Sequence, residues 1–508
     1  MSGTNSFDDT TKKELASASL EEAKTNGVGL GDLEYTAEED KALLRRIDWF
    51  LLPVCCFSYG IQFIDRTSLS SSAIFGLIED NNLVGRQFSW LTTIFYLGYL
   101  VFEFPANWLM QKFEVGYVLS VLMFLWGAMV FFIAACKNFA QLAAVRFLLG
   151  AFESAISPGL LLIMAQFYTT REQTSRVLIY SSMNQLFASF TGVLVYLLGK
   201  NALDNPNTLA GWQQIHLLLG AITIASAILV FFFVRSIDRV WWLSSAQKQQ
   251  AKHRVRANKT NTNEVHKWNW DQAKECMYDP QVWLSSLIVA ILSVPNGGIT
   301  SFAAQLIKSL GFSSLRTIIL QIPMNVFGVS MFVVSIFTVS KFNNLRLYLC
   351  ALWPMMTVVG LIAVVALPAT PQYKWARYGC LFLHSLFSLA MFFVFGLVPS
   401  NVAGRTKKTV VSTLIFVMYC VGNLCGGLVF KPSDAPAFRT GLITCIACLF
   451  VSSCLALVLR VYYVRENKRR DAVMHAQGLT EEDRHRLGSA AGDEDLTDIQ
   501  NKWFRYAV

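Results

Sequence analysis

Apolar residues along this chain fall into long runs, each about the length of a membrane-spanning helix. A helix of about 20 apolar residues crosses the hydrocarbon core of a bilayer, which is about 30 Å thick. The cores of twelve such runs lie at residues 48–70, 88–110, 117–136, 141–165, 177–199, 211–234, 281–303, 317–340, 345–367, 376–400, 409–429 and 440–462. The pattern predicts an all-α membrane protein with twelve transmembrane helices.

A polar stretch at residues 235–280 separates the sixth run from the seventh. It divides the chain into an N-terminal six-helix half at 48–234 and a C-terminal six-helix half at 281–462. The polar segments 1–47 and 463–508 are predicted tails, and the first has the composition of a disordered segment. No cleavable signal peptide is expected, so the first spanning helix would direct insertion. Two six-helix halves joined by a long loop are typical of the major facilitator fold, whose substrate site lies between the halves.

Composition supports a membrane protein and argues against other classes. Hydrophobic residues make up 54% of the chain and charged residues only 15%, against about 25% in soluble domains. The formal net charge is +9, but the basic residues stand in short loops beside apolar runs, so we expect no nucleic-acid partner. The eleven cysteines lie mostly inside apolar runs, and even the CxxC of Cys445 and Cys448 does so. Neither a disulfide framework nor a metal site is indicated.

Lysine and arginine are unevenly distributed over the loops. Most stand in loops on the side of the amino terminus, including the central loop and the segment RENKRRDA after the last run. Loops rich in these residues stay in the cytoplasm, so we expect both termini there. The sequon at Asn258 lies in the central loop and is therefore expected to remain unglycosylated.

Four charged residues lie inside the predicted spans: Asp65 and Arg66 in the first, Arg146 and Glu153 in the fourth. A charge at the centre of a spanning helix costs about 2.5 to 3.5 kcal/mol, so each should face a cavity or a partner. Neighbouring residues on a helix point about 100° apart, so Asp65 and Arg66 should have different partners. Arg146 and Glu153 are seven residues apart and share nearly one face. The four residues either pin two helices together or line a polar path, and two sets in one half favour the path.

Such a path suits an organic anion. The guanidinium group of arginine is charged at every relevant pH and binds two carboxylate oxygens at once. Burial favours the neutral form of an acid, whereas a nearby arginine favours the charged form. A site balanced between these effects can change its protonation as the bundle opens to each side.

Other polar groups in the spans are weaker candidates. Gln185 and Asn423 could each hydrogen-bond a ligand or hold helices together. We expect a structural role for Glu103, close helix packing at the GxxxG of 422–426, and a core position for His384 rather than a role as proton carrier.

The first span, LLRRIDWFLLPVCCFSYGIQFIDRTSLSSSAIFGL, resembles that of the fungal allantoate permease family, in the anion:cation symporter branch of the major facilitator superfamily. Similar segments extend over nearly the whole chain: IFYLGYLVFEFPANWLMQKF, KNFAQLAAVRFLLGAFESAISPG, FYTTREQTSRVLIY, IKSLGFSSL, NVAGRTKKTVVSTL, KPSDAPAFRTG, RENKRRDA and LTDIQNKWFRYAV. The yeast permeases for allantoate, nicotinate and other carboxylic acids are the most similar members in these motifs.

The resemblance implies proton-coupled uptake of a small organic anion by alternating access. At the matching positions, Asp65 and Glu153 would be the acids linked to the proton, and Arg66 and Arg146 would bind or regulate the anion. The proton would be the coupling ion, with no other cofactor. A monomer in the lipid bilayer is expected, in the plasma membrane by family default, with the endoplasmic reticulum or vacuole as alternatives.

Parts of the chain fit the family less closely. Gln185 and Asn423 fall near ligand-contact positions of the family, but this alignment is looser. Many relatives have Asn-Tyr where this chain has Gln62 and Phe63, so a tyrosine hydroxyl is missing and a more apolar ligand is implied.

The sequence leaves function and substrate open within limits. Proton-driven efflux and a transporter-like nutrient receptor are alternatives to uptake. An intramembrane enzyme is not indicated, because the spans contain no HExxH or GxSxG motif. Allantoate, ureidosuccinate, nicotinate, dipeptides and a sulfonate all remain candidate substrates.

Overall fold

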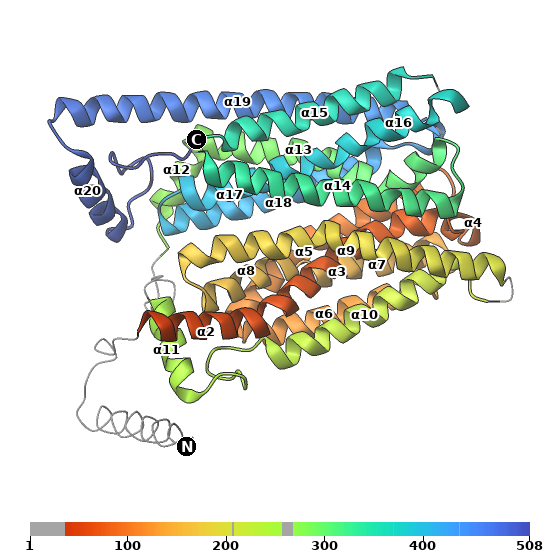
Figure 1. Ribbon diagram of the computed structural model, residues 1–508, viewed down its shortest axis with the longest axis horizontal. Coiled ribbons are helices and arrows are strands. Elements are labelled where there is room, and N and C mark those ends of the chain that lie inside the picture. Colours follow the sequence, from red (N-terminus) through yellow and green to blue (C-terminus); the bar gives the residue numbers. More distant parts are fainter. Residues whose placement is uncertain (1–35, 206–207, 257–267, 343, 369, 436) are drawn as a thin grey trace, which may run out of the picture.

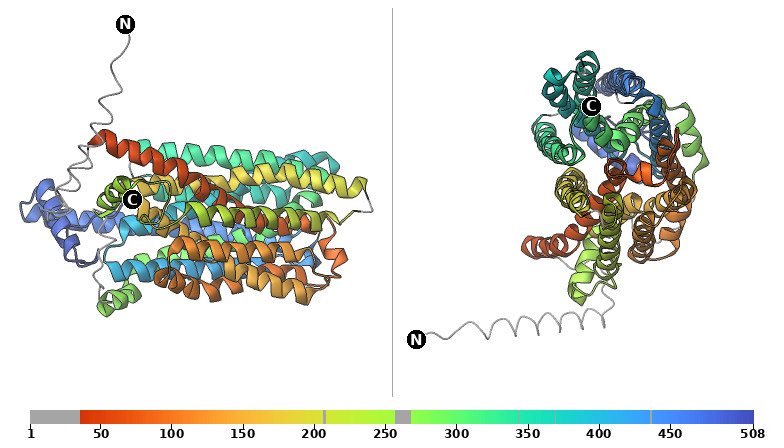
Figure 2. Two further views of the ribbon diagram at one scale, coloured as in Figure 1. Left: turned by 90° about the horizontal axis from the view of Figure 1, so that it is seen from below. Right: turned by 90° about the vertical axis from the view of Figure 1, so that its right-hand side faces the viewer.

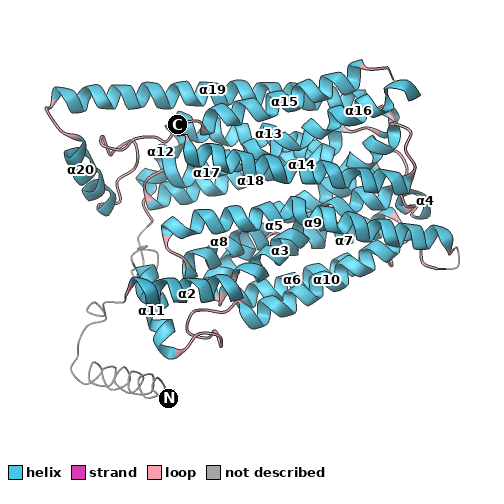
Figure 3. Cartoon of the chain, viewed as in Figure 1, coloured by secondary structure: helices cyan, strands magenta, loops and turns pink. Residues whose placement is uncertain are grey.

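The computed structural model describes residues 36–205, 208–256, 268–342, 344–368, 370–435 and 437–508. Helices and loops make up these residues, and no strand occurs among them (Figure 3). The predicted all-α class is confirmed. Residues 1–35 of the disordered tail expected at 1–47, and the sequon at Asn258, lie outside the described residues. Residues 37–47 of that expected tail are helical instead, because Thr36 and Glu39 form a capping box that starts a helix there.

The first half of the chain forms the helices α2 Ala37–Phe50, α3 Leu52–Ala73, α4 Leu77–Asp80, α5 Gln87–Lys112, α6 Val115–Ile133, α7 Phe139–Glu153, α8 Ile156–Phe167, α9 Thr170–Asp204 and α10 Gly211–Phe233. Helices α2 and α3 make one span, and Pro53 stands in the first turn of α3, where its missing N–H is tolerated. Helices α7 and α8 likewise make one span.

The remainder of the chain forms α11 Ser245–Arg256, α12 Trp270–Tyr278, α13 Pro280–Ser309, α14 Ser314–Lys341, α15 Arg346–Ala366, η1 Pro371–Tyr373, α16 Lys374–Leu381, η2 Phe382–Leu386, α17 Phe387–Asn401, α18 Arg405–Val429, η3 Pro432–Asp434, α19 Arg439–Ala476 and α20 Glu481–Asp493. The run predicted at 376–400 is not a single α-helix, because the 3₁₀ segment η2 interrupts it. Such an interruption often marks a hinge or a functional position.

Eleven spans in the described part of the chain are long and apolar enough to cross a membrane. The twelfth predicted run, 88–110, coincides with α5, which is not one of these eleven although its 26 residues extend about 39 Å. Helix α5 carries polar groups such as Thr92, Thr93 and Glu103, and all three are buried. These groups lower its hydropathy, and they face protein because α5 packs against α7 and α18.

The spans form two bundles that lie side by side along the chain's long axis. In Figure 1 the helices up to α10 occupy the lower part and those from α13 to α19 the upper part, and the end view of Figure 2 shows the same division. Helix α3 packs against α13, α5 against α18 and α9 against α14. These three helix pairs form the interface at which the candidate site lies.

One end of the bundle collects the first described helix, the helices of the central loop and the carboxyl terminus. The start of α2, the short helices α11 and α12, helix α20 and the carboxyl terminus all lie at the left of Figure 1, whereas α4 and α16 lie at the right. The amino-terminal helix, the central loop and the carboxyl terminus, which the charge pattern assigned to one side of the membrane, therefore lie at one end of the structure.

Two glycines set the distance between α5 and α7. A Cβ atom on Gly98 would lie 2.1 Å from the carbonyl oxygen of Phe147, and one on Gly150 would lie 2.0 Å from that of Phe95. Real atoms do not approach so closely, so these positions require glycine. The close approach places Arg146 of α7 beside Phe95 and Tyr96 of α5, with which it lines one cavity.

Candidate functional site

Arg66 of α3 links the two halves of the molecule. Its Nε donates a hydrogen bond to Oε1 of Glu153 on α7 at 2.7 Å, and its Nη1 donates to the hydroxyl of Tyr419 on α18 at 2.8 Å. The guanidinium carbon lies 5.8 Å and 5.5 Å from the ring centroids of Phe95 and Tyr99. The Glu153 side chain is fully buried. The ion pair between α3 and α7 is thus connected to the second half by one hydrogen bond to a neutral hydroxyl, that of Tyr419.

Asp65 points to a different neighbour, as the helix geometry predicts. Its Oδ2 accepts a hydrogen bond from Nε1 of Trp126 on α6 at 3.0 Å. Its Oδ1 has no hydrogen-bond partner, and no ion pair of Asp65 occurs among the described residues. The side chain is almost fully buried. Its hydrogen-bond partner is thus the indole of the third span, while Arg146 of the fourth span is the charged residue that acts on it most.

Arg146 of α7 is buried to 2% exposure, and two of its nitrogens, Nε and Nη2, have no hydrogen-bond partner in the described structure. Buried donors without a partner are rare, and each calls for an explanation. Nε and Nη2 lie on one edge of the guanidinium group, where their N–H bonds point the same way. This edge matches the two oxygens of a carboxylate. Asp65 and Glu153 are the acids whose charges act on Arg146.

Both arginines line one small cavity at the interface of the halves. Its walls come from α3, α5, α7 and α13: Arg66, Leu69, Thr92, Phe95, Tyr96, Arg146, Thr300 and Ser301. It contains two cations and several neutral donors, and no acid lines it within the described chain. Such a surface favours an anion.

A larger cavity lies beside the first, and Thr300 contributes to both. No charged side chain lines it in the part of the chain that the structure describes. Its polar residues come from six helical elements of both halves: Thr67, Ser68, Ser70, Ser71, Gln185, Thr191, Asn296, Thr300, Gln321, Asn325, His384, Ser385 and Ser388. Amide, hydroxyl and imidazole groups can both donate and accept, so this cavity suits an uncharged polar body.

The two amides singled out from the sequence occupy different positions. Gln185 of α9 lines the large cavity. Asn423 of α18 does not line it, because it is fully buried and its Oδ1 accepts a hydrogen bond from Nδ2 of Asn296 at 2.8 Å. Its own Nδ2 donates to the carbonyl oxygen of Tyr419. Asn423 therefore orients Asn296, which does line the cavity.

The residues where this chain departs from its family also separate. Phe63 lines the large cavity and presents a ring without a hydroxyl. Gln62 is buried, and its Oε1 accepts a weak hydrogen bond from Ser157 at 3.5 Å. The missing tyrosine hydroxyl is thus a difference in the lining of the cavity itself.

His384 and Glu103 complete the set of polar groups expected in the spans. His384 lies in η2, where its Nδ1 is bonded to the carbonyl oxygen of Leu381 at 2.7 Å, and its ring faces the large cavity. It is therefore a cavity residue as well as a hydrogen-bonded one. Glu103 of α5 is buried, and its Oε2 has no hydrogen-bond partner in the described structure.

Sequence reasoning missed several of the residues that build the site. Asn296, Gln321 and Asn325 are amides inside apolar spans, so the criterion that selected Gln185 would have selected them too. Trp126 and Tyr419 gave no such signal. Aromatic residues are common in spans, and only the three-dimensional structure shows that their polar atoms meet Asp65 and Arg66.

The fold and the cavities define the class of protein. Two helical bundles with polar cavities at their interface, inside a multi-pass membrane protein, form the architecture of a secondary transporter. The family model of the Major Facilitator Superfamily matches residues 55–430, so the chain belongs to this superfamily. The predicted fold is confirmed, and this superfamily is one of transporters rather than of enzymes.

Relatives of known name agree with this assignment. The chain is 34% identical to an uncharacterized transporter of Schizosaccharomyces pombe, over 94% of this chain and 89% of that protein. It is 30% identical to the allantoate permease of Saccharomyces cerevisiae, over 94% of this chain and 88% of the permease. The resemblance to allantoate permeases is therefore confirmed.

The comparison with solved structures confirms the fold and carries no conclusion about function. A bacterial homologue of the human lysosomal transporter Spinster superposes with a TM-score of 0.58 at 17% identity, covering 82% of this chain and 96% of the homologue.

Proposed function

We propose that this transporter imports a small organic anion together with protons by alternating access. The observation that carries the proposal is the position of Arg66, which is ion-paired to Glu153 and hydrogen-bonded to Tyr419 across the interface of the halves. In the major facilitator fold, the substrate site lies at this interface near the midplane. A carboxyl group that binds or releases a proton there can alter the contact between the halves.

The proton is proposed to act through Glu153. When its carboxylate is charged, it holds the Nε of Arg66 at 2.7 Å. Protonation removes the negative charge and leaves the Arg66 guanidinium available to a substrate carboxylate. After the halves have rocked, the substrate and the proton, both taken up from outside, are released into the cytoplasm. Asp65 is proposed as a second acid linked to the proton, through its bond to Trp126.

The anion is proposed to bind between Arg146 and Arg66 in the small cavity, and its body to extend into the large one. The paired nitrogens of Arg146 fit a carboxylate, and Gln185 and Asn296 can bond neutral polar groups. Asn423 supports Asn296. Substrate and proton shift the equilibrium only if each binds more tightly to one conformation than to the other.

Allantoate is the first candidate substrate, because a relative at 30% identity is named for it. Nicotinate and related small carboxylic acids are the next candidates. We further propose a monomer in the plasma membrane with both termini in the cytoplasm, with no cofactor besides the proton and no nucleic-acid partner.

The proposal is tested by uptake of radiolabelled allantoate into cells with and without the gene, at acidic and at slightly alkaline external pH. Uptake should be faster at acidic pH, where the proton gradient is larger, and should collapse when an uncoupler is added. A competition panel of unlabelled acids then ranks the substrates. Uptake that ignores both pH and the uncoupler would refute proton coupling. Export of allantoate from preloaded cells without any uptake would indicate efflux instead.

Phe63→Tyr is expected to change selectivity rather than to abolish transport. The new hydroxyl would enter the large cavity, where it can bond a polar group of the substrate. One neutral hydrogen bond contributes about 1 kcal/mol, so acids that carry amide or hydroxyl groups should gain about fivefold in affinity over apolar acids. The ratio of KM values for a polar and an apolar acid measures this change. Phe57→Tyr, outside the lining, is the matched control, and an equal shift in both variants would contradict the prediction.

A further inference from the structure

The carboxyl-terminal residues pack against the end of the bundle at which α11 and α12 lie. They follow α20 and return toward α12, α17 and α19 (Figure 1). Thr497 and Asp498 are fully buried, and Tyr506 is 3% exposed. Chain termini are usually poorly ordered unless they are tied down. This carboxyl-terminal segment, residues 495–508, is thus part of the packed structure.

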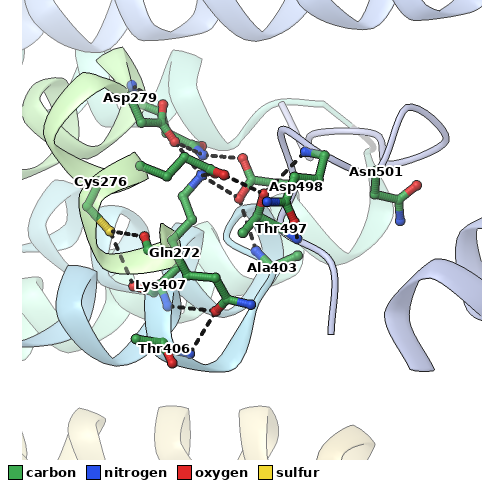
Figure 4. Close-up of polar contacts among 12 residues, drawn as sticks. Gln272, Cys276, Asp279, Ala403, Thr406, Lys407, Thr497, Asp498 and Asn501 are labelled. Carbon is green, nitrogen blue, oxygen red and sulfur yellow. Dashed lines mark hydrogen bonds and ion pairs between the residues drawn. The ribbon is translucent and has the colours of Figure 1, made fainter. Parts of the chain in front are cut away.

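Lys407, in the first turn of α18, is the centre of the attachment. Its Nζ lies 2.8 Å from Oε1 of Glu275, 2.6 Å from Oδ2 of Asp279 and 2.9 Å from Oδ1 of Asp498 (Figure 4). Glu275 belongs to α12, and Asp279 caps the start of α13. The side chains of Lys407, Asp279 and Asp498 are fully buried. One ammonium group therefore joins two helices and the carboxyl-terminal segment to α18.

Asp498 makes one ion pair and accepts three hydrogen bonds, and these contacts use both of its oxygens. Oδ1 faces Lys407 and the backbone N–H of Ala403 at 3.2 Å. Oδ2 accepts from Nε2 of Gln281 at 2.7 Å and from the hydroxyl of Tyr506 at 2.9 Å. Burial and the neighbouring Asp498 raise the pKa of Tyr506, so this phenol stays protonated and donates. Every group around Asp498 is a donor, which suits a carboxylate and no other side chain of this size.

Backbone contacts extend the attachment to two further helices. Nδ2 of Asn401, at the end of α17, donates to the carbonyl oxygen of Ala507, and the N–H of Ala507 donates back to Oδ1 of Asn401. Asn467 of α19 makes the same pair of bonds with Tyr506. Arg470 of α19 donates to the carbonyl oxygen of Phe504. The segment thus bridges α17, α18 and α19.

We propose that residues 495–508 form a latch that fixes this end of α18. The helix is continuous from Lys407 to Tyr419, twelve residues and about 18 Å along its axis. Tyr419 bonds Arg66, and Asn423 one turn further bonds Asn296. A rigid helix that is held at one end by the latch therefore positions both contacts of the second half with the candidate site. Release of the latch frees α18 and loosens these contacts.

The direct test is Asp498→Asn in the full-length protein. The amide nitrogen must face either the Lys407 and Ala403 donors or the Gln281 and Tyr506 donors, so two of these four contacts are lost. Hydrogen–deuterium exchange of the purified protein in nanodiscs should show residues 495–508 exchanging about tenfold faster or more. The first turns of α18 should exchange faster as well. Lys502→Ala, whose side chain is exposed on the same segment, is the matched control and should change neither region.

The position of α18 is measured separately, by electron paramagnetic resonance distances between spin labels at Lys41→Cys and Lys408→Cys. Both side chains are exposed and stand at this end of opposite halves. The distribution of distances between the two labels should be narrow in the unaltered protein and broad in Asp498→Asn. Tyr506→Phe removes one hydrogen-bond donor and keeps the ring, so it should give a distance distribution of intermediate breadth. This milder variant still tests the latch if Asp498→Asn fails to fold.

Each outcome decides the question. A freed segment with α18 unchanged would show that the segment is attached without acting as a latch. A segment that stays protected in Asp498→Asn and in Tyr506→Phe would show that this cluster does not hold it. Neither measurement needs a substrate, so the result does not depend on the proposed function.

Discussion

Glu153→Gln is expected to abolish concentrative uptake while leaving exchange of labelled for unlabelled substrate. Glutamine keeps the size of the side chain and can still accept a hydrogen bond from Arg66, but it cannot bind or release a proton. Each pH unit supplies 1.36 kcal/mol per coupled proton, so a gradient of two units can concentrate a substrate about 100-fold. The variant should bring this ratio to about one. Accumulation and counterflow in reconstituted vesicles measure the two activities separately.

Glu103→Gln provides the matched control for this substitution. Glu103 is also a buried carboxyl, but it makes no ion pair among the described residues and lines neither cavity. It should retain uphill uptake. If Glu153→Gln still concentrates substrate, or if it stops exchange as well as accumulation, Glu153 is not the residue that couples the proton.

Much of the fold could be predicted because the length of each apolar run can be read from the sequence and compared with the thickness of a bilayer. The runs at 48–70 and 409–429, for example, coincide with helices. The interruption of the run at 376–400 by η2 could not be predicted in this way, because residues 382–386 contain no proline or glycine that would indicate a break in the helix. The folded carboxyl-terminal segment was missed for another reason. Its polar residues resemble a solvated tail, and their partners in α12, α17 and α18 lie far away in the sequence.

The candidate site was predictable in its charges and not in its contacts. Asp65, Arg66, Arg146 and Glu153 were found because a charge in a span is expensive. Helix geometry also indicated that Asp65 and Arg66 have different partners. Their neutral neighbours were not predictable, since Trp126 resembles many other aromatic residues of the spans. The separation into a cationic cavity and a neutral one depends on packing between the halves, which no single helix encodes.

Arg146→Gln is expected to reduce substrate affinity strongly. Removing one partner of a buried, hydrogen-bonded charge pair costs about 2 to 5 kcal/mol, which corresponds to a loss of about 30-fold or more. Arg146→Lys keeps the charge but lacks the two parallel N–H bonds, so it should recover only part of this loss. Binding of the best acid from the competition panel to purified protein measures the effect, and size-exclusion chromatography verifies that each variant is folded.

A second role for Arg146 must be separated from this one, because its charge also acts on Asp65. If Arg146 only offsets that carboxylate, then Arg146→Gln combined with Asp65→Asn should bind substrate almost as the unaltered protein does. If its free edge holds the substrate carboxylate, the double variant should stay as weak as Arg146→Gln alone. We expect the second result, because Nε and Nη2 of Arg146 have no hydrogen-bond partner in the described structure, and Asp65 uses Trp126 instead. Recovery in the double variant would assign Arg146 to charge balance and leave Arg66 as the anion contact.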